Sequence, residues 1–128
     1  MELNILLVDD SATVRGLVAR ALRLAGLPLG NVSQAGNGVE ALEVLKTQEV
    51  DVVVTDIHMP EMDGLALIAH LRADPMLKHL PVIVVSTEGG AERIAEAREL
   101  GIKAYLRKPF KPEQVKEAVN CAVGVVHE

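Results

Sequence analysis

Three acidic side chains and one lysine draw attention because each lies just past the end of a short, mostly apolar run. Asp9 and Asp10 come after a run that begins at residue 5, Asp56 comes after one that begins at residue 52, and Lys108 comes after the last such run. If these runs are neighbouring strands, the three carboxylates crowd together, and they repel unless one is protonated or a cation lies among them. A hard divalent ion takes oxygen ligands, and Mg²⁺ needs only a couple of carboxylates plus waters.

The lysine and two hydroxyl side chains extend this set toward an anion. Lys108 would supply a second positive point beside the metal, and phosphate is the anion that fits best between them. Ser86 and Thr87 follow another apolar run and add hydroxyl groups. A carboxylate beside bound phosphate and Mg²⁺ can act as a nucleophile, which would make Asp56 the site of an aspartyl phosphate.

Each residue taken alone also has an ordinary structural explanation. Asp10, followed by Ser11, could simply cap a helix, and Asp56 could be a turn residue. Lys108 alone would be a solvated charge, which is the usual environment of a lysine, and the hydroxyls could bond the local backbone. What favours the functional interpretation is the conjunction of these groups at four strand ends.

The elements that must position these residues alternate strictly along the chain. Apolar runs predict strands over Asn4–Val8, Asn31–Ala35, Asp51–Thr55, Val82–Ser86 and Lys103–Arg107. Helical patterns lie between and after them, at about 14–25, from a cap at Asn37 to about 46, over Gly64–Arg72 with Asp63 as the cap, over Glu92–Leu100, and from Pro112 onward. Strict alternation predicts an α/β fold with a parallel sheet and five helices on its two faces.

The polarity of the strands predicts their order in the sheet. The first, third and fourth strands are continuously apolar, as strands covered on both faces should be. The second and fifth carry polar residues, which is typical of sheet edges. This predicts the order 2-1-3-4-5 of the flavodoxin-like doubly wound fold, in which sites lie at the carboxyl ends of the strands.

Four stretches together resemble one protein family. They are ILLVDDS at 5–11, VVVTDIHMPEMDG at 52–64, PVIVVST at 81–87 and AYLRKPF at 104–110. The chain resembles the receiver domain of two-component response regulators, and most closely the stand-alone chemotaxis (CheY-like) type. The resemblance runs from about residue 4 to residue 123, so residues 1–128 are expected to form a single receiver domain.

The resemblance implies a role for each acid. Asp56 would be the phosphoacceptor. Asp10 would bind Mg²⁺ directly, Asp9 would act alongside it or through water, and the backbone carbonyl of His58 would complete the ligands that the protein offers.

It also implies roles for the strand ends farther along the chain. Lys108 would hold the phosphate, with Ser86 and Thr87 at the same site. Ser86 would be the switch hydroxyl, Tyr105 the aromatic side chain that follows it, and the Lys108–Pro109 bond would be cis.

The implied partners are proteins. A histidine kinase would be the phosphodonor, and a downstream target would bind the face formed by the last two helices and the strand at 103–107. A single-domain phosphorelay shuttle is an alternative output. We expect residues 87–94 to be the most mobile part of the ordered chain, because paired glycines interrupt it.

Three other classes are considered. A flavodoxin-like electron carrier would need a hydroxyl-rich phosphate loop and stacking aromatics, whereas the loop after residue 8 begins with two acids and the chain has one Tyr and one Phe. A haloacid-dehalogenase-like phosphatase would need an acid at position 58, which holds a histidine. A degenerate receiver that acts only as a docking module ranks low, because all the key groups are present. We therefore expect a signalling protein that catalyses only its own phosphorylation and dephosphorylation.

Composition excludes further classes. The net charge of −5 argues against nucleic acid as a partner. There is no apolar run of ~18 residues for a membrane span and no signal-peptide pattern at the start. The single cysteine, Cys121, is expected on or near a helix's core face. A cytoplasmic monomer is the expectation.

Overall fold

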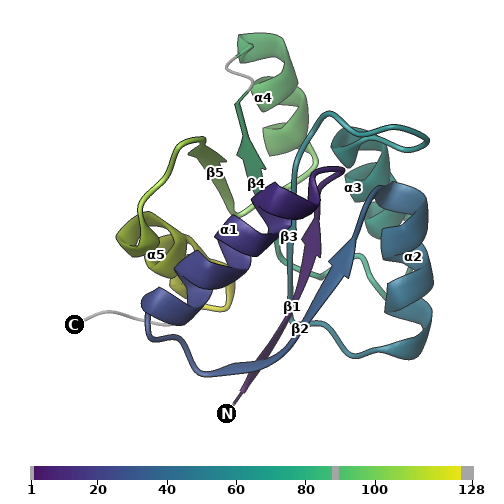
Figure 1. Cartoon of the computed structure of the whole chain (residues 1–128). Coiled ribbons are helices and arrows are strands. Elements are labelled where there is room, and N and C mark those ends of the chain that lie inside the picture. Colours follow the sequence, from purple (N-terminus) through teal and green to yellow (C-terminus); the bar gives the residue numbers. More distant parts are fainter. Residues whose placement is uncertain (1, 88–89, 125–128) are drawn as a thin grey trace.

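The computed structural model describes residues 2–87 and 90–124, which form a five-stranded parallel sheet flanked by helices (Figure 1). The strands are β1 (Leu3–Val8), β2 (Leu29–Ala35), β3 (Val52–Thr55), β4 (Val82–Ser86) and β5 (Ala104–Arg107). The helices are α1 (Ala12–Leu24), α2 (Gly38–Thr47), α3 (Gly64–Ala73), α4 (Ala91–Glu99) and α5 (Pro112–Ala122).

The strand order is β2-β1-β3-β4-β5, with every neighbouring pair parallel, which confirms the predicted doubly wound topology. Every residue of β3 and β4 is buried, and β1 is buried except at one position. In β2 and β5 most residues are partly exposed. Strand polarity therefore separates centre from edge for the reason given above: a central parallel strand is covered on both faces.

The helices divide into two layers, each closing one half of the core. Helices α1 and α5 lie on one side of the sheet, and α2, α3 and α4 lie on the other (Figure 1). The buried side chains of each group pack with the face that they cover. Helix α4 contributes only one fully buried side chain, Ala97. Its docking is the thinnest of the five, as the many charged residues of this helix predict.

Helix caps settle one ambiguity in the sequence. Ser11, not Asp10, caps α1: its hydroxyl accepts a hydrogen bond from the amide of Val14 at 3.2 Å. Asn37 and Asp63 cap α2 and α3 through their side chains, as predicted. Because capping α1 does not need Asp10, its carboxylate is available at the end of β1.

Some boundaries differ from prediction by one or two residues, and one burial was wrong. Strand β2 begins at Leu29 rather than Asn31. Cys121 is exposed, because the buried positions of α5 include 118, 119 and 122 and leave 121 on the outer face. Among the described residues, no helix has the length and apolarity that a membrane span requires.

Candidate functional site

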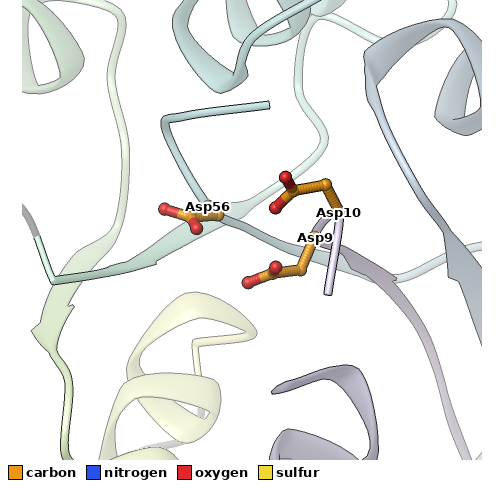
Figure 2. A group of neighbouring side chains, drawn as sticks. All are labelled: Asp9, Asp10 and Asp56. Carbon is orange, nitrogen blue, oxygen red and sulfur yellow. The ribbon is translucent and has the colours of Figure 1, made fainter. Parts of the chain in front are cut away.

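The carboxyl ends of β1 and β3 bring three carboxylates together (Figure 2). Asp9, Asp10 and Asp56 each offer an oxygen, and these oxygens lie within 4.8 Å of one another. Asp9 is buried, Asp56 is half-buried and Asp10 is exposed, so the cluster grades from the core to solvent. Three oxygen donors at this spacing, open on one side to water, fit a hard divalent ion such as Mg²⁺.

Lys108, just after β5, neutralises part of this charge. Its Nζ lies 2.9 Å from Oδ2 of Asp9 and 3.2 Å from Oδ2 of Asp56, and its side chain is only 14% exposed. Burial of the ammonium lowers the pKa of Lys108. The hydrogen bond to Asp9 and the charges of Asp56 and Asp9 more than offset this, so the pKa is raised above its ordinary value. The lysine therefore stays charged and bridges the two deeper acids.

The phosphoacceptor candidate is held by its own backbone. The amide of Ile57 donates to Oδ1 of Asp56 at 2.7 Å, and the amide of Asp56 donates to Val8 of β1 at 2.9 Å. Oδ1 is thus fixed by a main-chain donor while Oδ2 faces Lys108. One carboxylate oxygen is oriented by the backbone and the other is paired with the Lys108 ammonium.

The chain after Asp56 returns to it at Gly64, the first residue of α3. The amide of Gly64 donates to Ile57 at 2.7 Å. A Cβ atom at residue 64 would stand 2.0 Å from the carbonyl oxygen of Asp56, far inside van der Waals contact. Only glycine allows α3 to begin this close to the acid.

The other predicted site residues surround the acids at different depths. Ser86 is fully buried at the end of β4, and Thr87 beside it is exposed. Tyr105, on β5, is half-buried against the core layer of α2, α3 and α4. His58 has an exposed side chain, and the Lys108–Pro109 peptide bond is cis. Of the segment predicted to be mobile, residues 88 and 89 lie outside the described residues.

One residue of the site was missed at the sequence level. Arg15, on the second turn of α1, donates from Nη1 to the backbone carbonyl of Asp9 at 2.5 Å and from Nε to Oε1 of Gln34 in β2 at 2.9 Å. It also lines a small cavity of about 10 Å³ together with Asp9 and Asp56. An arginine inside an otherwise ordinary helical stripe gives no signal of this role, because its partners are a carbonyl and a neighbouring strand.

Comparison with known proteins gives a consistent result. A family model described as the response regulator receiver domain matches residues 5–120. The chemotaxis protein CheY-3 of Vibrio cholerae is 42% identical over 118 residues, which are 92% of this chain and 89% of that protein. The chemotaxis protein CheY of Pseudomonas aeruginosa is 39% identical over 118 residues, 92% of this chain and 94% of that protein.

Solved structures agree with the sequence relatives. The chemotaxis response regulator CheY4 of Vibrio cholerae superposes with a TM-score of 0.81 at 31% identity, covering 94% of this chain and 98% of that one. The family match at residues 5–120 therefore includes all the strand ends that carry the acidic cluster.

Proposed function

This chain belongs to the response regulator receiver domain family, of the CheY chemotaxis type, and from that premise we propose that it accepts a phosphoryl group on Asp56. The observation that carries the proposal is the bridge formed by Lys108, whose ammonium lies 2.9 Å from Asp9 and 3.2 Å from Asp56. A fixed cation beside one nucleophilic carboxylate, with two further acids alongside, suits phosphoryl transfer better than a purely structural ion pair.

The chemistry is an exchange of one bond to phosphorus for another. An oxygen of Asp56 attacks the phosphorus of a phosphohistidine, the new O–P bond forms, and the N–P bond breaks with its electron pair going to the imidazole. Lys108 can follow the charge from the carboxylate to the phosphoryl oxygens, because a lysine ammonium is a compact point charge on a flexible stem. The buried Asp9 would stay bonded to Lys108 while the lysine also contacts the phosphoryl group.

The acidic cluster fits a divalent ion. Asp9, Asp10 and Asp56 would hold Mg²⁺, with the backbone carbonyl of His58 as the further ligand that the family resemblance implies. When bound, Mg²⁺ would neutralise negative charge on the transferring group. The residues themselves account for the charge balance: three carboxylates face one lysine, which leaves two negative charges for a divalent cation to offset.

The output of this chemistry is a change of partner. We place the phosphodonor in the histidine kinase class, and the target on the face made by α4, β5 and α5. Exposed basic side chains edge this face at Lys103, Arg107, Lys111 and Lys116, which suits an acidic partner. Ser86 and Tyr105 would couple the site to that face. A single receiver domain that works as a monomer, either on a chemotaxis target or as a phosphorelay shuttle, completes the proposal.

Labelling with acetyl phosphate tests the phosphoacceptor. Wild-type protein should gain one phosphoryl group only when Mg²⁺ is present, and Asp56→Asn should gain none. Asp74→Asn serves as the matched control, because Asp74 lies at the end of α3 away from the cluster and should label normally. Labelling that persists in Asp56→Asn would remove this residue from its role.

The partner side has its own test. A pull-down from the parent cell with wild-type protein, phosphorylated or not, and with Asp56→Asn should separate phosphorylation-dependent partners from the rest. A histidine-containing phosphotransfer protein among them would favour the relay output, and a motor component would favour chemotaxis.

A further inference from the structure

Arg15 is a firmly bonded side chain at the acidic cluster, and it has no assigned part in phosphoryl transfer. It belongs to α1, on the side of the cluster opposite the strand that leads to Lys108. Its guanidinium joins two elements: Nη1 donates to the carbonyl oxygen of Asp9 at 2.5 Å, and Nε donates to Gln34 of β2 at 2.9 Å. The fork geometry of arginine allows one side chain to make both bonds.

The bond to Asp9 falls where the sheet ends. The amide of Asp9 donates to Ala35, the last residue of β2, at 3.1 Å. Beyond that residue the chain leaves β2 and turns toward α2, so β2 offers no further backbone amide in register with the carbonyl of Asp9. Arg15 supplies the donor for the Asp9 carbonyl and is itself tied to β2 through Gln34. The arginine thus extends the strand pairing by one peptide group.

That peptide group carries the most buried acid of the cluster. Asp9 is 7% exposed, its Oδ1 accepts from the amide of Ser11 at 2.9 Å, and its Oδ2 accepts from Lys108 at 2.9 Å. The carbonyl of Asp9 belongs to the peptide plane that joins Asp9 to Asp10, so a displacement of that plane would shift the main chain from which both acidic side chains project. Arg15, Asp9 and Asp56 also line one small cavity beneath the strand ends.

We propose that Arg15 is a positioning residue for the acidic cluster: it fixes the main chain of Asp9 to β2 and thereby keeps the Asp9 carboxylate directed at Lys108 and at the divalent-ion site. The proposal rests on the proposed function for the meaning of that site. Groups that orient metal ligands in this way typically change metal affinity by about 10- to 100-fold when they are removed.

The sign of the effect separates positioning from simple charge. A guanidinium close to a divalent cation repels it, so a role through charge alone predicts that Arg15→Ala binds Mg²⁺ more tightly than wild type. Positioning predicts the opposite, a loss of about 10-fold. Arg15→Lys keeps the charge but offers a single nitrogen, which cannot hold Asp9 and Gln34 together, so its Mg²⁺ affinity should also fall.

The experiment measures the Mg²⁺ dissociation constant by calorimetric titration for wild type, Arg15→Ala, Arg15→Lys and Gln34→Met, with a thermal melt of each. Arg23→Ala is the control, since Arg23 is an exposed arginine of the same helix. Gln34→Met, which leaves Arg15 intact but removes its anchor, should weaken binding less than either Arg15 variant. Arg23→Ala should bind as wild type does.

Amide hydrogen exchange without metal completes the test. The amide proton of Ser11, which donates to Asp9, should exchange faster in both Arg15 variants, while amides of β4 should keep wild-type rates. Unchanged or tighter Mg²⁺ binding in Arg15→Lys and Arg15→Ala would overturn the proposal. If Arg15→Ala does not fold, Arg15→Lys and Gln34→Met carry the test alone. Wild-type protein that binds no Mg²⁺ and takes no label would instead refute the proposed function.

Discussion

Each end of the parallel sheet holds a partly buried cation, Lys108 at the carboxyl ends of the strands and Arg72 at the amino ends, and the two have different partners. At the carboxyl ends of the strands, Lys108 lies between the carboxylates of Asp9 and Asp56, and its pKa is raised. At the amino ends of β4 and β5, Arg72 donates only to backbone carbonyls, at 2.7 Å to Leu100 and 2.8 Å to Leu80, and burial lowers its pKa.

The difference lies in what each cation could exchange. Arg72 makes two further bonds, to Lys78 at 3.1 Å and Gly101 at 3.3 Å, and so ties the end of α4 and the segment before β4 to α3. Dipoles of the backbone satisfy it, and no other ion can take its place there. The partners of Lys108 are two carboxylates that could equally serve as metal ligands, and its ammonium could equally pair with a phosphoryl group. Architecture depends on the first arrangement, and chemistry on the second.

The largest expected effect on stability is at the amino end. Arg72→Leu should lower the free energy of unfolding by about 3 kcal/mol, because several carbonyls lose their donor at once. Mg²⁺ affinity should not change, since Arg72 lies at the other end of the sheet. Urea unfolding and a Mg²⁺ titration measure the two quantities. Arg98→Ala, at an exposed position of α4, is the control and should stay within about 0.5 kcal/mol of wild type. A parallel loss of Mg²⁺ binding would break the comparison.

Lys108→Met should cost less, and its cost should depend on metal. Removing the ammonium leaves Asp9 and Asp56 facing each other, which should destabilise the metal-free protein by about 2 kcal/mol. Added Mg²⁺ should recover most of that loss and should raise the melting temperature of the variant more than that of wild type. If Mg²⁺ raised the melting temperatures of the two proteins equally, the lysine and the metal would not be neutralising the same carboxylates.

The pH dependence sharpens the same point. A lysine whose pKa is raised on folding contributes stability that is fully present below its ordinary value of 10.5 and is lost as pH rises through the folded pKa. The stability difference between wild type and Lys108→Met should therefore be flat near neutral pH and shrink only above that value. Denaturant midpoints of both proteins, measured from neutral pH to above the pKa of the lysine, check this. A stability difference that already changes near neutral pH would show that a group other than Lys108 causes it.

The smallest effect is expected at Asp10, the exposed member of the cluster. Asp10→Asn removes one of three mutually repelling charges, so the metal-free melting temperature should rise by about 2–4 °C. The same change should weaken Mg²⁺ binding. Glu49→Gln, an exposed acid remote from the cluster, should do neither. A lower melting temperature for Asp10→Asn would mean that repulsion is not what Asp10 contributes without metal.

Some features could be predicted from the sequence because a residue type occurs mainly in one structural environment. Continuous apolar runs identify β3 and β4 as central strands, and this fixes the sheet order that brings Asp9, Asp56 and Lys108 together. Side-chain caps were equally predictable at Asn37 and Asp63, because capping needs a local acceptor at one position.

What could not be predicted involves partners without a sequence pattern. Arg72 bonds to backbone carbonyls, and so does Arg15 through one of its two bonds. Every residue has a carbonyl, so nothing in the sequence distinguishes these arginines from solvated ones. Cys121 was expected to face the core because cysteines are often buried, but the helical phase of α5 turns it outward. Residue type was a weaker guide there than position on the helix.

Gly64 and Arg72 give α3 a mechanical part that neither shows alone. The helix starts in contact with the carbonyl of Asp56, where a Cβ atom would find no room, and near its end Arg72 is fastened to four carbonyls. At ten residues it is about 15 Å long, so it connects the acidic cluster at one end of the sheet with the bonds of Arg72 at the other. Because both ends of α3 are held by close contacts, the helix has little freedom to move. Deformation that begins at the acidic cluster must therefore be taken up by softer parts, foremost the lightly docked α4.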